Sequence, residues 1–311
     1  MRNQIIRQTS PILDLQQLGA ELHIYGEIDD PAMRHFNPSI AWHNDKLKIV
    51  VRSCNFAVNR HGNFYFRDGS AYSKTDVLYG DVNPDTLKVT DLQLLKLKYA
   101  PIHTQISGLE DVRIFSRKDG MHAIGFESDR LTRSLHNGSS SLAEYLIKGN
   151  ELKYIRTLEK PKKETVEKNW SPTDHQSKDF EFTYSPTQVW KNGEVTGIPY
   201  KGIIHGGSQL LKQKDGSYLS VVHDKVADPR LRLVYDRFIY RTYLARHDKM
   251  GIITHLTKPF TFGTHENIEF ASGMVEYDGS FIISLGIRDA KFAIAKIKKN
   301  KLVNLLNQVN L

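Results

Sequence analysis

Short apolar runs alternate with Asp-Gly-type turns along most of the chain, and this alternation predicts β-hairpins. In the clearest copy, the apolar runs 112–115 and 121–126 flank a charged turn at 118–120. The same order of run, turn and run recurs with different polar residues at its ends. The five copies start near Asn37, Gly108, Asn169, His205 and Ala271.

Helical periodicity is scarce, whereas Val, Ile, Phe and Tyr are frequent between Gly, Asp, Asn and Pro; this is an all-β pattern. Only 302–309 has a helical pattern, and 139–147 suits either type. Repeated hairpins favour a propeller over a sandwich, and a doubly wound fold would need helices between the strands. We therefore predict an all-β, five-bladed β-propeller with a short C-terminal helix. It forms a single domain over 1–311, in which 157–168 is an exposed excursion between blades.

Composition limits the class of protein. Hydrophobic residues make up 40% of the chain, which is enough for a core. The single cysteine, Cys54, excludes an intramolecular disulfide and suggests a small buried side chain. No apolar stretch approaches the ~18 residues of a membrane span, and the N-terminal residues lack the apolar core of a signal peptide. These features predict a soluble, cytoplasmic protein.

The formal net charge is +8, and lysines cluster at 160–168 and 296–301. Such clusters are commonly solvated faces, but they also suit an anionic partner such as phosphate, a sugar nucleotide or nucleic acid. Charge does not decide among these. No Walker-type loop, dinucleotide fingerprint, nucleophile elbow or zinc-ligand spacing is present, so we predict neither a cofactor nor a metal.

Polar residues occur where the hairpins begin and end. A hairpin's turn lies at one end, so the residue before its first strand and the residue after its second strand lie together at the other. If the hairpins surround an axis, these residues converge on one mouth of the channel. The converging residues are Asn37, Arg52, Glu110, Asp111, Arg113, Lys168, Asn169, His205, His223, Arg288 and Asp289.

Each of these residues also has a purely structural interpretation. An Asp before a strand is commonly a turn or cap residue, but Asp111 stands beside Glu110 and Arg113. His205 and His223 are equally compatible with hydrogen-bonded structural histidines. Tyr240 belongs to an aromatic and basic run, which is either an outer strand or a surface for sugar stacking or phosphate contact.

Several of these motifs together resemble the β-mannoside phosphorylases and the related five-bladed-propeller mannosyltransferases. The resemblance spans about 36–297 as islands, of which Glu-Asp-x-Arg is the most specific. The residues within these motifs most closely resemble those of an uncharacterised propeller branch that includes viral and glycosyltransferase-associated proteins. The islands are Phe36-Asn-Pro-Ser, Glu110-Asp-Val-Arg, Lys168-Asn-Trp, Gly206-Gly-Ser, His223 and Gly286 to Asp289.

The resemblance implies that Asp111 is the general acid and that Asp289 holds sugar hydroxyls. It also implies phosphate binding by Arg113, Lys168 and His223. Two departures are present: Val112 replaces the family's Pro, and the fourth-blade motif reads His-Gly-Gly-Ser-Gln. The donor or acceptor side is therefore expected to differ from that of the family.

An inverting glycosyl transfer needs one proton-carrying acid and a cationic clamp for phosphate, whereas a hydrolase needs a second carboxylate ~6.5–9.5 Å away. We expect a glycosyltransferase with a sugar-nucleotide or sugar-phosphate donor, a glycan or nucleic-acid acceptor, and Asp111 as the catalytic residue. The alternatives are a glycoside phosphorylase or hydrolase acting on an oligosaccharide, and a non-catalytic propeller that binds carbohydrate or nucleic acid. The predicted binding residues are Asn37, Arg52, Glu110, Arg113, Lys168, Asn169, His205, His223, Tyr240 and Asp289.

Overall fold

The computed structural model describes ten stretches of the chain: residues 12–26, 31–58, 64–70, 73–97, 106–127, 141–158, 169–173, 179–200, 202–227 and 238–309. Within these stretches the regular structure is almost all β-strand, with one short helix. The strands form one sheet of eight strands, two of five, two of four and one of two. The fold is therefore all-β, as the sequence predicts.

The strands of each sheet are close in sequence. One five-stranded sheet holds β3 (Arg34–His43), β4 (Lys46–Cys54), β7 (Ser73–Val82), β8 (Val89–Leu94) and β10 (Ile106–Ser107). The other holds β9 (Lys96–Leu97), β11 (Glu110–Arg117), β12 (Gly120–Glu127), β13 (Ser141–Lys148) and β14 (Glu151–Leu158). A four-stranded sheet follows with β15 (Ser171–Pro172), β16 (Phe182–Ser185), β17 (Gln188–Lys191) and β18 (Glu194–Gly197).

The last two large sheets include strands from both ends of the chain. The eight-stranded sheet contains β1 (Leu13–Asp14), β19 (His205–Gly206), β20 (Leu211–Lys212), β21 (Tyr218–Ala227), β22 (Phe238–His247), β23 (Ile253–Leu256), β24 (Phe260–Thr261) and β28 (Asn307–Gln308). The other four-stranded sheet contains β2 (Glu21–Tyr25), β25 (Glu269–Tyr277), β26 (Ser280–Ile287) and β27 (Lys291–Lys298). Strands β5 (Phe56–Val58) and β6 (Phe64–Phe66) form the small sheet.

All five predicted hairpins are present as antiparallel pairs: β3 with β4, β11 with β12, β15 with β16, β20 with β21, and β25 with β26. Two of their turns show why Asn, Asp and Gly occur there. Asn44 and Asp45 have φ of 48° and 59°, and Asp278 and Gly279 have φ of 45° and 63°. Two successive positive φ angles define the turn whose twist matches a hairpin, and these residue types tolerate it best.

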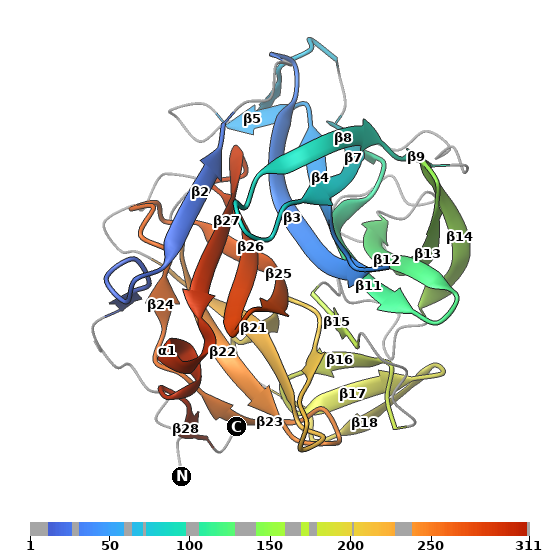
Figure 1. The fold of residues 1–311 in the computed structure, drawn as a ribbon. Coiled ribbons are helices and arrows are strands. Elements are labelled where there is room, and N and C mark those ends of the chain that lie inside the picture. The colour runs from blue at the N-terminus through green and yellow to red at the C-terminus, as the bar shows by residue number, and fades with distance from the viewer. Residues whose placement is uncertain are drawn as a thin grey trace.

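The large sheets are arranged like the blades of a β-propeller with at least four blades (Figure 1). Strand β2, from the start of the chain, pairs antiparallel with β27 near its end, from Glu21 opposite Lys296 to Tyr25 opposite Phe292. Strands β1 and β28, near the two ends of the described chain, both belong to the eight-stranded sheet. A strand from the start of the chain thus completes the sheet that holds the last hairpin.

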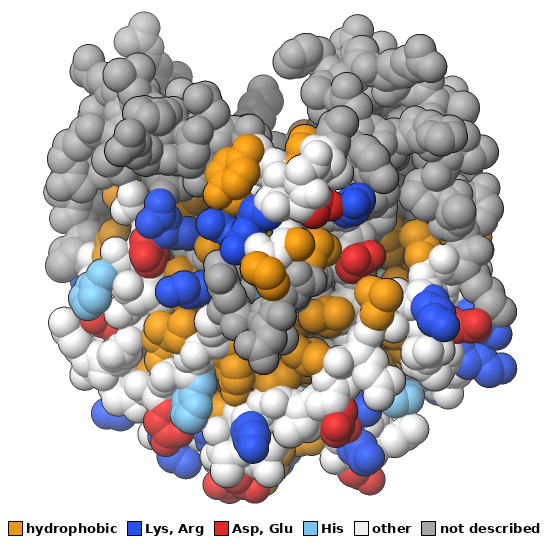
Figure 2. Space-filling view, turned by 90° about the horizontal axis from the view of Figure 1, so that it is seen from above, with side chains coloured by type: hydrophobic (Ala, Val, Ile, Leu, Met, Phe, Trp, Pro, Cys, Tyr) orange, Lys and Arg blue, Asp and Glu red, His pale blue; other side chains and the backbone are white. Residues whose placement is uncertain are grey.

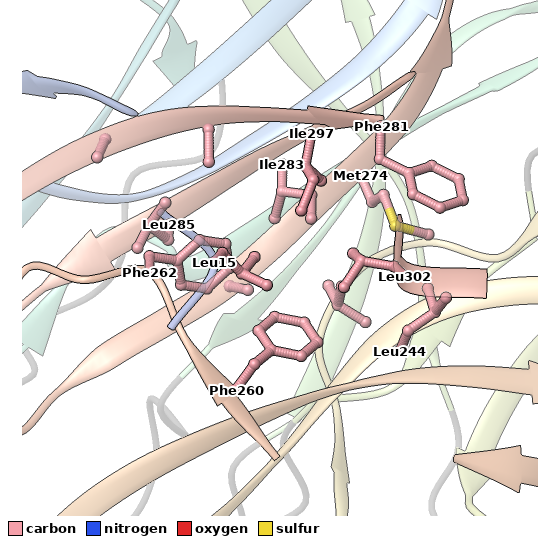
Figure 3. Close-up of a cluster of buried hydrophobic side chains, with 14 of the residues drawn as sticks. Leu15, Leu244, Phe260, Phe262, Met274, Phe281, Ile283, Leu285, Ile297 and Leu302 are labelled. Atoms are coloured by element: carbon pink, nitrogen blue, oxygen red, sulfur yellow. The ribbon is translucent and has the colours of Figure 1, made fainter. Parts of the chain in front are cut away.

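Apolar side chains from neighbouring sheets fill the space between them. Figure 3 shows Phe260, Met274, Phe281 and Leu302 converging in the largest cluster, which lies between the eight-stranded sheet and the β25–β27 sheet. Each such side chain contributes about 1.5–3 kcal/mol on full burial. Cys54 is buried, as the sequence suggests.

The C-terminal segment differs from the sequence-based prediction. The helix α1 (Lys299–Val303) is five residues long and begins before the predicted 302–309 segment. The chain then turns and forms β28, in which Asn307 lies opposite Leu256. Buried Leu302 anchors the helix. The pairing of β28 with β23 takes the place of a second helical turn. Residues 139–147, which suited either type, belong mostly to strand β13.

Two further points concern the chain as a whole. Most of the predicted excursion at 157–168 lies outside the described residues. Among the described helices, none has the length and apolar character needed to cross a membrane.

Candidate functional site

Two β-bulges place Asn37 and Asp111 at equivalent positions in neighbouring sheets. The pairing of β3 with β4 shifts between Phe36 and Ser39, and that of β11 with β12 shifts between Glu110 and Arg113. Asn37 and Asp111 both have φ of 48°. Asn and Asp adopt this left-handed conformation more readily than other side-chain-bearing residues, and a bulge redirects the side chain it carries.

The two bulged residues are in direct contact. Asn37 Nδ2 donates a hydrogen bond of 2.9 Å to Asp111 Oδ1, and the Arg52 guanidinium donates to the same oxygen at 3.1 Å. The other terminal nitrogen of Arg52 lies 3.0 Å from Glu110 Oε1. The carboxyl group of Asp111 is therefore fixed in place by two side chains from a neighbouring sheet.

Arg52 is buried but firmly charged. Its guanidinium lies over the rings of Phe36 and Phe56, at 5.1 and 5.8 Å from the ring centroids. Burial by itself would lower the pKa of Arg52, but Glu110, Asp111 and Asp289 outweigh it, so the pKa is raised. This places Asp289, which follows β26, within the electrostatic reach of the same cluster.

Gly286 makes room for this arrangement. A Cβ atom at position 286 would lie 2.0 Å from Asn37 Oδ1, which no real contact permits. The glycine of the Gly286 to Asp289 motif therefore has a packing role beside Asn37.

Arg113 joins three sheets and lies in the interior. It is 1% exposed; its Nε donates to the carbonyl of Gly207, and a terminal nitrogen donates to Asn169 Oδ1 at 2.9 Å. Burial lowers the pKa of Arg113 to about 10, and Asp111 opposes this only in part. Its guanidinium therefore ties the blades together, in addition to any role toward a ligand.

Aromatic rings form the other side of the site. His223 and Tyr240 stack at 5.7 Å with an interplanar angle of 10°, and Phe270 meets His223 edge-on at 5.0 Å. Burial lowers the pKa of His223 well below its ordinary value, and His205 and Arg113 add to this shift. Burial, then Asp289 and Asp111, raise the pKa of Tyr240 to about 12. Both rings are uncharged at neutral pH.

Most of the predicted residues thus lie together. We call the following set the mouth site: Asn37, Arg52, Glu110, Asp111, Arg113, Asn169, His223, Tyr240, Phe270 and Asp289. His205 lies opposite His223 in the pairing of β19 with β21, and it is exposed beside the set. Lys168 lies outside the described residues. Arg288 is exposed and lies 3.5 Å from Glu266.

Sequence reasoning did not single out Phe270 or Gln209. Phe270 directly precedes the last hairpin copy, but the rule that selected Asn37 and Asp111 considered only polar residues and therefore passed over it. Gln209 is fully buried, and its Nε2 donates to the carbonyls of Ile40 and Met274 at 2.7 Å each. It links three sheets, and only its place in the His-Gly-Gly-Ser-Gln motif hinted at this.

The other candidate features of the described structure give less evidence of a functional site than the mouth site does. Within the part of the chain that the structure describes, no group of three His, Cys, Asp or Glu side chains is arranged to hold a metal. A cleft of about 190 Å³ between β7, β8 and the β13–β14 turn contains none of the mouth-site residues. On the face seen in Figure 2, basic, acidic and apolar side chains are intermingled, so its described part offers no continuous basic surface for nucleic acid.

No protein-family model matches the chain, and no curated protein matches it. Solved structures do. The β-1,2-mannobiose phosphorylase from Listeria innocua is 13% identical with a TM-score of 0.62, covering 92% of this chain and 99% of that one.

Two proteins from Leishmania mexicana are also similar. MPT-4, described as a mannose phosphorylase in complex with phosphate, is 12% identical with a TM-score of 0.55 over 93% of this chain and 92% of its own. MPT-1, a GDP-Man-dependent mannosyltransferase, is 13% identical with a TM-score of 0.56 over 89% of each chain. At this level of identity the similarity establishes the fold, which is the β-propeller of these proteins.

Proposed function

We propose that this chain is a glycosyl-transferring enzyme in which the carboxyl group of Asp111 carries a proton. The observation that carries the proposal is the position of Asp111: a bulged residue at φ 48°, held by Asn37 and Arg52. Backbone strain and converging polar contacts of this kind concentrate at functional sites. The fold is shared with proteins described as phosphorylases and a mannosyltransferase, which supports sugar chemistry.

The architecture that goes with this proposal is one five-bladed propeller domain. Five sheets have four or more strands, and each includes one of the five hairpins, which supports the count. The active site would lie where the first strands of these hairpins begin.

The chemistry is a substitution at the anomeric carbon of a sugar. One carbon–oxygen bond breaks and another forms to the incoming oxygen. In phosphorolysis, Asp111 gives its proton to the departing sugar oxygen; in transfer from a sugar nucleotide, it takes the proton of the acceptor hydroxyl. Asn37 and Arg52 orient this carboxyl group, and Asp289 accepts hydrogen bonds from sugar hydroxyls.

A phosphorylase or hydrolase that acts on an oligosaccharide is the second candidate. Two observations favour the hydrolase over the two functions that need a bound phosphate group. Three carboxylates, from Glu110, Asp111 and Asp289, surround Arg52, and a hydrolase needs a second carboxylate as base. In addition, Arg52 and Arg113 are both engaged by neighbouring residues. A phosphate group would rely on other cations, of which Lys168 is the predicted one.

Three parallel reactions of the full chain distinguish these functions. The substrates are GDP-mannose with a mannose acceptor, β-1,2-mannobiose with inorganic phosphate, and β-1,2-mannobiose alone. Nucleotide release indicates a transferase, phosphate-dependent cleavage a phosphorylase, and cleavage without phosphate a hydrolase. Sugar binding without turnover in any reaction would identify a binding protein and would overturn the proposal.

A further inference from the structure

His223 is buried without the hydrogen bonds that a buried imidazole ordinarily makes. It is 3% exposed, and neither ring nitrogen has a hydrogen-bond partner among the described residues; Nδ1 is also fully shielded. A buried polar group without a partner costs about 1–3 kcal/mol, so most such groups are satisfied in the working molecule. The histidines at positions 122 and 247, by contrast, use both of their ring nitrogens.

Tyr240 adds a second hydrogen-bonding group, a partly exposed phenol, next to the first. Its ring stacks on His223 and lies edge-on to Phe270, at 6.4 Å. Its phenol oxygen makes no hydrogen bond to the part of the chain that the structure describes, whereas Tyr243 on the same strand donates to Asp224. Together the two residues present an aromatic surface with an imidazole and a hydroxyl that can both donate and accept.

The charges around this pair disfavour an anion. His223 is uncharged at neutral pH because burial lowers its pKa, and the phenol of Tyr240 is uncharged there like that of any tyrosine. The carboxylates of Asp111 and Asp289 are near enough to influence Tyr240. Two cations influence His223, Arg113 and Lys225. Arg113 lies over the Phe270 ring and bonds to Asn169 and Gly207, and Lys225 lies over the Phe238 ring. An uncharged ring with several hydroxyls suits these surroundings better than a phosphate does.

We propose that His223 and Tyr240 bind the uncharged sugar ring of the substrate and not its phosphate group. This inference rests on the proposed function, and it reverses the role that the family resemblance implies for His223. The sugar ring packs against the aromatic surface, and its hydroxyls bond to the phenol oxygen and to imidazole Nε2, the ring nitrogen of His223 that is not fully shielded.

The test measures calorimetric affinities of the full chain for two separate probes, methyl β-D-mannopyranoside and inorganic phosphate. His223→Phe keeps the ring but removes both nitrogens, and Tyr240→Phe removes only the hydroxyl. Tyr154→Phe, at a half-exposed position on β14, is the matched control. We expect each site variant to bind the sugar about tenfold more weakly, the value of one lost hydrogen bond. Phosphate affinity should stay within twofold, and the control should equal wild type.

The remaining outcomes are distinguishable. Variants that lose phosphate and keep the sugar, or a wild type that binds phosphate but no sugar, would overturn this inference and leave the proposed function standing. A wild type that binds neither probe would overturn both. If His223→Phe fails to fold, Tyr240→Phe decides alone, because that residue is only partly buried.

Discussion

Asn37 and Asp111 occupy matching bulges in two neighbouring sheets, with the same φ of 48° and a 2.9 Å hydrogen bond between their side chains. Neither residue could reach the other from a regular strand, because a bulge is what turns each side chain out of the sheet. The orientation of Asp111 therefore depends on backbone geometry in two blades at once. Substitutions can separate the backbone contribution from that of the side chain.

Substitution of Asn37 tests that separation. Asn37→Gly keeps the left-handed backbone and removes the amide, whereas Asn37→Ala also forces a Cβ into that conformation. We expect the Ala variant to be less stable than the Gly variant by about 1–2 kcal/mol in urea unfolding. Both should lose turnover, since both lose the bond to Asp111. Equal stabilities would show that the positive φ is not maintained in solution.

Gly286→Ala should disturb Asn37 directly. The added Cβ would lie 2.0 Å from Asn37 Oδ1, so the amide must move away from Asp111. We expect turnover to fall about tenfold or more and stability by about 1–3 kcal/mol, the usual cost of overpacking. Gly26→Ala is the control, because a Cβ at position 26 would contact nothing within 4 Å. Full activity of Gly286→Ala would mean that Asn37 does not position Asp111.

Arg113→Ala should destabilise the fold as well as the site. The side chain is 1% exposed and bonds to Asn169 and Gly207, so its removal leaves a cavity and two lost hydrogen bonds. We expect a loss of about 2–5 kcal/mol in urea unfolding. Arg288→Ala, which removes an exposed arginine, should cost no more than about 1 kcal/mol. An Arg113→Ala protein of normal stability that loses only ligand affinity would instead support a dedicated phosphate clamp.

Acid should weaken the fold through His247. This ring is buried, with Nε2 2.8 Å from Ser220 Oγ and Nδ1 3.0 Å from the Gly251 carbonyl. Burial lowers the pKa of His247 to about 4. Between pH 6.5 and about 4 the unfolded chain takes up a proton that the folded chain does not, so stability falls as pH falls.

The expected loss from His247 alone is about 2 kcal/mol between pH 7.5 and 5. Urea unfolding gives the change in unfolding free energy between the two pH values for wild type and for His247→Gln. The difference between the two changes is the contribution of His247. The same change at exposed His23 controls for the loss of an imidazole. A His247→Gln protein with the wild-type pH dependence would show that this ring titrates alike in both states.

The hairpins could be predicted from sequence because their signals are local. Asn44-Asp45 and Asp278-Gly279 need positive φ at adjacent residues, and the flanking runs are apolar. The C-terminal segment could not be predicted in this way, because its second half pairs with β23, which lies far from it in the sequence. Tertiary pairing there outweighs local helical preference.

The positions of the site residues were predictable, but their contacts were not. The hairpin rule brought Asn37, Arg52 and Asp111 together, since it needs only the direction of each strand. It could not show that Arg113 is buried with Asn169 and Gly207, because burial depends on how the blades pack. For the same reason, the neutral state of His223 becomes apparent only in the folded structure.

Turnover by Asp111→Asn tests the central claim most directly. Asparagine keeps the shape of the side chain and an oxygen that can accept from Asn37 and Arg52, but it cannot transfer a proton. In whichever of the three reactions the wild type catalyses, we predict that turnover falls about 10²-fold or more while sugar affinity is retained. Glu110→Gln, the same change one residue away, should lower turnover less. Turnover by Asp111→Asn near that of wild type would contradict the account and direct the search to Glu110 and Asp289.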